Sequence, residues 1–570
     1  MPWRIPIPQY RSKAAEIPVA ESVEVKQQKA EHMSDIKLLD CTLRDGGYIN
    51  DWNFGEYTIR KVMSKLIESG VDYIEVGFLR DCEYDPERAL YNNCAEIARI
   101  LPENRGNTKF TAMSLHNKYS VDKLEPYDGK TIEAVRVTFH DYDIDEGLDY
   151  IRRVKDKGYK VFANPINIMG YSDEMILRLL QKVNEIRPYA FSIVDTFGSM
   201  MKDDLLRIYS LIEHNLGKDI TIGLHLHENL AMSYSLAQDF INMKASGRNC
   251  VIDASMLGMG RSPGNLCMEL IMDYMNKRRS GHYDVNPVLD GIDDHIARLK
   301  QIEPWGYNTA YAISAKYNLH RNYAEFLLDK GRLRAKQINQ ILGGIEEHKK
   351  TAYDEAYIEK LYQNFQNNAV DDTAALQDLA VNLAGRKCLI LAPGSSIAEE
   401  QDKIHAYIER ENPVVLAANF VPEHYCADYV FCCNAMRLES ILGTKKPSKL
   451  LITSNLVDLY EEKMNHIPAG MCAENSVQYV NYVDISFTES EPVDNSVIML
   501  LRLLKKLEVP QAALAGFDGY KSGREENYVA GYMASQHTKG EEENRKIRNH
   551  MRQMEKVLEI QYLTDSLYRS

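Results

Sequence analysis

The sequence lacks the long apolar segments of membrane-spanning and secreted chains. No run of about 18 apolar residues occurs in it. The opening residues, MPWRIPIPQYRSK, lack the apolar core that a signal peptide requires. We therefore expect a cytoplasmic protein with no membrane partner.

An excess of basic residues is also missing. The chain has 68 Lys and Arg against 82 Asp and Glu, a formal net charge of -14, and its pI is near 5.6. A nucleic-acid partner usually requires a concentrated basic face, so we expect none. The ten cysteines form no regular framework and no CxxC knuckle, which predicts reduced and mostly buried thiols.

What is present is an ordinary globular composition, 45% hydrophobic and 26% charged, in a chain of 570 residues. This length exceeds what one hydrophobic core serves, so two large domains are expected. Residues 1–32 have many charges and no apolar period, which predicts a disordered leader. The expected order is then a catalytic domain at 33–287, a helical region and linker at 288–385, and an α/β domain at 386–570.

The first domain alternates short β-rich runs with amphipathic helical stretches, as parallel βα units do. Eight such units in about 240 residues predict a (β/α)8 TIM barrel, with an open doubly wound sheet as the alternative. The predicted strands are IKLLD (36–40), YIEVG (73–77), KFTAM (109–113), AVRVTF (134–139), YKVFAN (159–164), AFSIVD (190–195), ITIGLH (220–225) and CVIDAS (250–255).

Polar residues gather at the carboxyl ends of these strands, where barrel enzymes place their chemistry. This clustering favours the barrel over the open sheet. The residues are Arg44, Asp45, Glu75, His116, Thr138, His140, Asn164, Asn167, Asp195, Thr196, His225, His227, Arg261 and Asn265.

A metal site is indicated by the segment GLHLHEN, in which His225 and His227 lie two residues apart at a strand end. The pleat turns both side chains to the same face, which suits chelation. Asp45 follows the first strand, which lies close to the seventh in a closed barrel, and it is the candidate carboxylate ligand. A carboxylate with two imidazoles favours Mn²⁺ or Mg²⁺ over Zn²⁺, and Co²⁺ is also accepted. The alternative is a packed histidine pair without metal.

The ordered strings LLDCTLRDGGY, YIEVGF, SIVDTFGSM, GLHLHEN and GMGRSPGN resemble the metal-dependent pyruvate aldolase and HMG-CoA lyase-like superfamily over residues 36–330. The similarity is greatest to 4-hydroxy-2-oxovalerate aldolase. The resemblance implies metal ligands at Asp45, His225 and His227, with Asn265 ligating or bordering the metal. It also implies a catalytic arginine at Arg44.

Further residues are expected to act beside the metal ligands and Arg44. Glu75 and Asp195 would hold Arg44 and the imidazoles in place, while Thr138, Asp195 and Thr196 would contact substrate. Tyr48 stands where the resembling aldolases have a histidine, and with an ordinary pKa of about 10 a tyrosine is a poor base at neutral pH. The general base is therefore left open among Tyr48, His116, His140, His320 and a metal-bound water.

Two features of the sequence bear on whether it resembles the HMG-CoA lyases or the aldolases of this superfamily more. The loop GMGRSPGN lacks the cysteine of the HMG-CoA lyases, because Cys267 falls beyond it. The segment PWGYNTAYAISAKYNLHRNY resembles the post-barrel helices of the aldolases, whose catalytic tyrosine would correspond to Tyr307 or Tyr311. Aromatic packing at helical spacing explains these tyrosines equally well.

The C-terminal domain shows a second α/β pattern that begins with RKCLILAPGSSI, a strand followed by a tight turn and a helix. Such a turn can present backbone amides to a phosphate. The order of elements resembles bacterial sialyltransferase-like and motility-accessory glycosyltransferase domains. That resemblance implies a nucleotide or nucleotide-sugar pocket lined by Gly394, Ser395, Ser396 and Asn419.

The leading hypothesis is a divalent-metal aldolase that couples the enolate of a 2-oxo acid with an aldehyde, here a sugar-like one destined for polysaccharide biosynthesis. A homo-oligomer is expected. The alternatives are a Claisen-type synthase that uses an acyl-CoA, and a nucleotide-sugar binder or transferase that works through the C-terminal domain.

Overall fold

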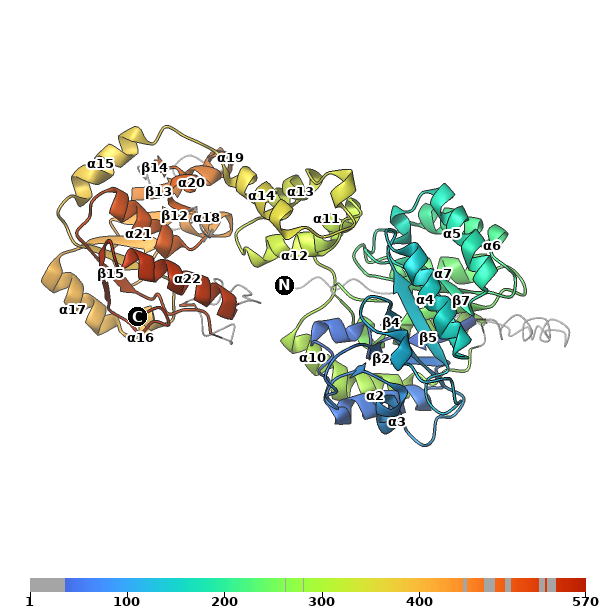
Figure 1. The fold of residues 1–570 in the computed structure, drawn as a ribbon. Helices are drawn as coiled ribbons and strands as arrows, with labels where there is room; N and C mark the ends of the chain where they lie inside the picture. The colour runs from blue at the N-terminus through green and yellow to red at the C-terminus, as the bar shows by residue number, and fades with distance from the viewer. Residues whose placement is uncertain are drawn as a thin grey trace, which may run out of the picture. The chain divides into compact units, whose positions relative to one another are not determined.

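The computed structural model describes residues 36–261, 263–279, 281–443, 449–465, 477–486, 494–521, 528–529 and 540–569 (Figure 1). The chain divides into two compact units, with the boundary between Tyr307 and Asn308. This boundary falls inside the stretch 288–385 that the sequence indicates as a helical connection. The leader expected at 1–32 lies outside the described residues.

The first unit is a closed barrel of parallel strands. Neighbouring strands pair in the order β1-β9-β8-β7-β6-β5-β4-β2, and β1 also pairs with β2, which closes the barrel. The predicted TIM barrel is thus confirmed, and the open sheet was the wrong alternative. The barrel strands are β1 (Ile36–Asp40), β2 (Tyr73–Leu79), β4 (Lys109–Leu115), β5 (Ala134–Phe139), β6 (Lys160–Pro165), β7 (Ala190–Asp195), β8 (Thr221–Leu226) and β9 (Cys250–Ala254), with the short β3 (Leu90–Tyr91) beside β2.

Helices follow the strands and cover the barrel with their apolar faces. In α4, for example, Leu148, Ile151 and Val154 recur at helical spacing and are buried. The helix α5 begins where the Ser172 side chain accepts a hydrogen bond from the amide of Met175. The main helices are α2 (Glu56–Glu68), α3 (Cys94–Ile100), α4 (Ile144–Asp156), α5 (Asp173–Ile186), α6 (Lys202–Asn215), α7 (Ser233–Met243), α8 (Met268–Arg279), α9 (Asn286–Gly291) and α10 (Ala297–Ile302).

The barrel interior changes from apolar to charged along the strands. A buried cluster that includes Tyr73, Ala134 and Val251 fills one layer. Two residues further along the same strands stand Glu75, Arg136 and Asp253, all buried. Since side chains two apart on a strand share a face, the layer nearer the carboxyl ends is ionic, and this is where the candidate site lies.

The second unit begins with helices and continues into a parallel sheet. Its strand order is β14-β13-β12-β11-β10-β15-β16. The strands are β10 (Cys388–Leu391), β11 (Val414–Ala418), β12 (Tyr429–Cys432), β13 (Lys449–Thr453), β14 (Val477–Val480), β15 (Gln511–Ala515) and β16 (Glu559–Tyr562). The helices are α11 (Thr309–Lys316), α12 (Asn322–Asp329), α13 (Ala335–Gly343), α14 (Glu355–Gln366), α15 (Thr373–Leu383), α16 (Ser396–Glu399), α17 (Gln401–Glu411), α18 (Ala435–Leu442), α19 (Val457–Met464), α20 (Tyr482–Ser486), α21 (Ser496–Lys506) and α22 (Gly540–Met554).

This sheet is doubly wound, as predicted for a second α/β domain. The chain runs outward from β10 to β14 and then returns to the other side of β10 with β15, so the strand order reverses between β10 and β15. Apolar clusters pack on both faces of the sheet. In the parts of the chain that the structure describes, no helix combines the length and the apolar character needed to cross a membrane.

Candidate metal centre

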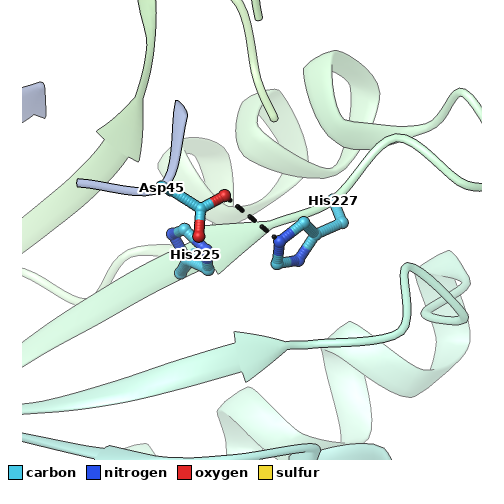
Figure 2. A group of neighbouring side chains, drawn as sticks. All are labelled: Asp45, His225 and His227. Atoms are coloured by element: carbon cyan, nitrogen blue, oxygen red, sulfur yellow. Dashed lines mark ion pairs between the residues drawn. The ribbon is translucent and has the colours of Figure 1, made fainter. Parts of the chain in front are cut away.

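Three predicted metal ligands converge at the carboxyl ends of β1 and β8. The ligand atoms of Asp45, His225 and His227 all lie within 4.8 Å of one another. Figure 2 shows the carboxylate of Asp45, carried by the segment after β1, beside the two imidazoles. Its Oδ2 atom is 3.5 Å from Nε2 of His227. The structure therefore brings together the set that the HxH spacing and the strand order predict.

The turn after β1 is built to hold Asp45 in this position. The amide of Asp45 donates to the carbonyl of Cys41 at 2.8 Å, and the indole of Trp52 donates to the carbonyl of Arg44 at 2.8 Å. Trp52 packs so closely on the turn that a Cβ at Gly47 would lie 2.0 Å from its ring. The second glycine of the RDGG segment is thus required by packing.

Both histidines use Nδ1 for a hydrogen bond, so Nε2 is the candidate coordinating atom of each ring. Nδ1 of His225 lies 3.0 Å from Oδ2 of Asp253, and Nδ1 of His227 lies 2.9 Å from the carbonyl oxygen of Asp195. Such bonds fix the tautomer and the orientation of a ligating imidazole. Burial lowers the pKa of His225 below its ordinary 6.5 although Asp253 opposes the shift, so the ring is neutral at pH 7.

Asn265 offers a further candidate ligand atom. Its Nδ2 donates to Asp45 Oδ2 at 2.8 Å and to the carbonyl of Met259 at 3.1 Å. Its Oδ1 is buried and has no hydrogen-bond partner among the described residues. An orphaned buried oxygen beside a carboxylate and two imidazoles suits a divalent cation. A Cβ at Gly260 would lie 2.3 Å from Nδ2 of Asn265, which explains the glycine in this loop.

Arg44 lies between two carboxylates. Its Nε donates to Glu75 Oε2 at 2.7 Å and its Nη1 donates to Asp45 Oδ1 at 2.5 Å. Burial favours the neutral form of Asp45, but Arg44 and His227 outweigh it and hold the pKa of this carboxyl well below its usual range. The carboxylate is thus ionised and ready to bind a cation. Glu75, expected to orient Arg44, contacts it directly.

Two residues that the sequence reasoning missed complete the network. Arg136 donates to Glu75 Oε2 at 3.1 Å and forms an ion pair with Asp253, which in turn holds His225. Asp253 keeps a lowered pKa, because Arg136 and His225 outweigh the effect of burial. The missed signal is a charged residue inside each of the strands AVRVTF and CVIDAS, where burial is tolerated only if the charge is paired.

The residues expected to bind substrate lie at strand ends near this network. Thr138 is buried at the end of β5. The carboxylate of Asp195 accepts from the amides of Ser199 and Met200, and burial raises its pKa to about 6. The hydroxyl of Thr196 accepts from the amide of Asn167 at 2.7 Å. Asp195 therefore orients His227 through its backbone carbonyl, while its side chain binds its own turn. The substrate role of all three stays a prediction.

The candidates for the general base fall into separate groups. His116 and His140, at the ends of β4 and β5, both contact Asp143 Oδ2, at 2.9 and 3.3 Å. Tyr48 is 39% exposed, packs edge-on against Trp52, and has the guanidinium of Arg261 5.3 Å from its ring centre.

The candidates after the barrel divide between the two units. Tyr307 is exposed at the end of the first unit, whereas Tyr311 and His320 belong to the second. Tyr311 packs in a buried apolar cluster, as expected for aromatic residues at helical spacing. These positions add no residue to the metal set.

The turn predicted to bind phosphate in the second unit already donates its hydrogen bonds to other groups of the protein. The amide of Gly394 donates to the carbonyl of Gly516, and the amide and hydroxyl of Ser396 donate to Asp518. Ser395 also reaches Asp518, at 3.4 Å. A Cβ at Gly394 would lie 2.3 Å from Gly516 O, so this glycine permits close packing of two turns.

Asn419, the fourth predicted nucleotide contact, is 9% exposed and borders the cavity after β10 and β15. Its Oδ1 accepts from the amide of Cys433 at 2.9 Å, and its Nδ2 donates to the Cys433 sulfur. Its side chain is therefore engaged with the neighbouring strand end. The nucleotide role of the four residues stays a prediction.

Comparison with known proteins addresses the barrel. Residues 35–294 match the HMGL-like family model. Oxaloacetate decarboxylase from Mycobacterium tuberculosis is 22% identical over 279 residues, which is 47% of this chain and 80% of the relative. The 4-hydroxy-2-oxovalerate aldolase 6 of Rhodococcus jostii is 23% identical over 254 residues, 44% of this chain and 70% of the relative.

A solved structure of HMG-CoA lyase from Brucella melitensis is 11% identical and covers 46% of this chain and 98% of its own, with a TM-score of 0.39. The family match coincides with the closed barrel and with the segments that carry Asp45, His225 and His227. The barrel region, residues 35–294, thus matches the HMGL-like family, and the two relatives that it resembles are named as a decarboxylase and an aldolase.

Proposed function

We propose that the barrel is a divalent-metal-dependent lyase that makes or breaks the carbon–carbon bond next to a 2-oxo acid, through the enolate of pyruvate. The observation that carries this proposal is the donor set at the strand ends. A carboxylate, two imidazoles with Nδ1 engaged, and a partnerless amide oxygen stand beside a buried arginine.

Asp45, His225, His227 and Asn265 would hold the cation, with Mn²⁺ as the preferred ion. When bound, the metal supplies Lewis-acid stabilisation of the substrate's carbonyl oxygen. The protein supplies the rest. Arg44, fixed by Glu75 and Asp45, directs a cationic guanidinium towards the oxygen on which negative charge develops.

The network Glu75–Arg136–Asp253 keeps Arg44 and His225 in place. Because its members are buried and hydrogen-bonded to one another, the site is ordered before substrate binds. Tyr48 and the His116–Asp143 pair are proposed to take part in proton transfer, and Thr138 and Thr196 in contacting substrate. Each of these assignments rests on a position at a strand end.

The substrates in the names of the two relatives support pyruvate enolate as the intermediate. Oxaloacetate and 4-hydroxy-2-oxovalerate are both 2-oxo acids, and cleavage of either at the bond beyond carbon 3 leaves the enolate of pyruvate. The two reactions differ in the fragment released, carbon dioxide or an aldehyde. We favour an aldehyde, because the sequence motifs resemble those of the aldolases.

The decisive experiment follows the methyl protons of pyruvate by NMR in deuterated water, with Mn²⁺ and with excess EDTA. Metal-dependent exchange, lost in Asp45→Asn, would support the proposal. Adding a panel of aldehydes, or acetyl-CoA, then separates aldol from Claisen chemistry by the product formed, and oxaloacetate tests decarboxylation. Exchange that persists in EDTA at the full rate would refute the proposal.

A further inference from the structure

A cavity of about 300 Å³ lies in the second unit, outside the metal centre. It is bordered by the segments that follow β10 and β15, the two strands between which the sheet order reverses. In open α/β sheets this is the general location of ligand sites, because the loops leave a crevice there. The volume is at the lower end of the range for small-molecule sites.

Arg332 lines this cavity and is only 7% exposed. Its Nη1 donates to the carbonyl oxygen of Cys433 at 3.1 Å and contacts the Cys433 sulfur at 3.4 Å. Within the described parts of the chain, no carboxylate lies within ion-pair distance of the guanidinium. Burial disfavours the charged form of the guanidinium, but neighbouring groups outweigh this effect and raise the pKa of Arg332 above its ordinary value. Arg332 is therefore a buried, fixed cation with which an anionic ligand would form a direct ion pair.

The nearest acidic group does not neutralise Arg332 by direct contact. Asp494 lies close enough to affect it electrostatically, but its two oxygens accept from the hydroxyls of Tyr362, at 2.7 Å, and Tyr482. Asp518 also lines the cavity and is similarly engaged with Ser396. Asp494 and Asp518 are thus held by neighbours. The lining also includes the acids Asp329, Glu355, Glu359, Glu542 and Glu543 and the cations Lys330, Arg437 and Lys546, but Arg332 is the buried cation among them.

The segment that carries Arg332 is held in place before any ligand arrives. It connects α12 to α13 and contacts the residues that follow β12. The side chain of Asn434 donates to the carbonyl of Gly331 at 3.2 Å, and Arg334 forms an ion pair with Glu439. A fixed guanidinium is suited to two-point binding of an oxyanion.

Part of the cavity lining is aromatic. Phe517 and Tyr568 lie with ring centres 4.6 Å apart, and Tyr520 follows on the same segment. Asn544 holds this part of the lining by exchanging hydrogen bonds with the backbone of Tyr520 and accepting one from the hydroxyl of Tyr568. Aromatic side chains of this kind bind the body of a small ligand, whether a planar ring or a sugar.

We propose that this cavity binds a small organic oxyanion, with its phosphate or carboxylate group against Arg332 and its body against Phe517, Tyr520 and Tyr568. The assignment places the anion at Arg332 and not at the Gly394–Ser396 turn, whose amides are engaged by Gly516 and Asp518. It is independent of the activity proposed for the barrel.

Calorimetric titration of the full-length protein tests this assignment. The panel is UMP, CMP, glucuronate and inorganic phosphate, with uridine, cytidine and glucose as the matching neutral controls. At least one organic anion should bind at or below millimolar concentration, and the matching neutral compound should bind at least about tenfold more weakly, a difference of about 1.4 kcal/mol. Preference for the nucleotides or for glucuronate identifies phosphate or carboxylate as the anionic group.

The variant Arg332→Met removes the charge and keeps much of the side-chain volume, so the same ligand should bind at least about tenfold more weakly. Arg332→Lys keeps a positive charge and should lose less affinity for this ligand than Arg332→Met. The matched control is Arg502→Met, because Arg502 donates to the carbonyls of Ile485 and Ser486 in the same unit but does not line the cavity. Binding by this control should equal that of the wild type.

The proposal is overturned if none of the organic anions binds at millimolar concentration, or if Arg332→Met binds as the wild type does. If the arginine variants fail to fold, a crystal structure of the wild type with the bound compound decides. An anionic group within hydrogen-bond distance of Arg332 supports the assignment, and one placed elsewhere refutes it.

Discussion

His225 Nδ1 lies 3.0 Å from Asp253 Oδ2, and the same oxygen is ion-paired with Arg136. One carboxylate therefore orients the imidazole of a proposed metal ligand and also joins it to the ionic layer inside the barrel. Through Arg136 and Glu75, this layer continues to Arg44. The proposed metal ligand His225 and Arg44 are thus positioned by one connected network.

The first prediction concerns Asp253. Asp253→Asn should lower metal affinity by about 10- to 100-fold, because His225 loses a charged partner at Nδ1. It should also lower the free energy of unfolding by ~3 kcal/mol, because Arg136 loses a buried ion pair. Calorimetric titration with Mn²⁺ and chemical unfolding measure the two effects.

The matched control for Asp253 is Glu213→Gln. Glu213 forms a buried ion pair with Arg248, at 2.8 Å, on the outside of the same barrel. This variant should lose similar stability and keep normal Mn²⁺ affinity. If the two variants lose the same affinity, Asp253 acts only on folding.

Removal of the metal should abolish turnover and lower the melting temperature of the barrel. A cation that binds only the folded state stabilises it by about 2.7 kcal/mol at a concentration 100 times its Kd. Thermal melts with Mn²⁺ and with EDTA should therefore differ for the wild type. Asp45→Asn and His225→Ala should show no such difference, and a full Mn²⁺ shift in either variant would exclude that residue as a ligand.

Arg44→Lys should keep the bound metal but lower turnover by about 100-fold, the range for one oxyanion-stabilising donor. A lysine has one ammonium group and cannot contact Glu75 and Asp45 with the fork that Arg44 uses. Metal content and steady-state rates are the measurements. A near-normal rate would place Arg44 outside the reacting groups.

The pH dependence of the metal-free barrel should contain a contribution from His225. Its pKa in the folded state lies below the ordinary 6.5, because burial disfavours the charged ring. The unfolded chain therefore binds a proton first as the pH falls below about 6.5, and the free energy of unfolding decreases there. Above that pH the contribution is constant.

Other buried groups titrate in the same range with the opposite sign, since burial raises the pKa of Asp40 to about 7 and that of Asp195 to about 6. The contribution of His225 is therefore measured as the difference between the wild type and His225→Gln in EDTA, from pH 7.5 to 5.5. The stability of the wild type should fall relative to the variant as the pH decreases. A difference that stays constant would contradict the assigned shift.

Local sequence was sufficient for much of the fold and of the ligand set. The eight strand segments of the barrel were identified from their apolar runs, and the HxH spacing alone turns His225 and His227 to one face. The position of Asp45 required one further step, the neighbourhood of the first and seventh strands across the eighth in a closed barrel, which the order β1-β9-β8 confirms.

Tertiary structure alone decided which groups are partners. Arg136 and Asp253 each stand as one charge in an apolar strand, and only barrel closure brings these strands together as an ion pair. The Pro-Gly-Ser-Ser turn has the local form of a phosphate cradle, yet Asp518, 122 residues away, accepts the amide hydrogen of Ser396. Local pattern determines which face a side chain takes, whereas its partner depends on where distant segments meet, and this is set by the packing of the whole domain.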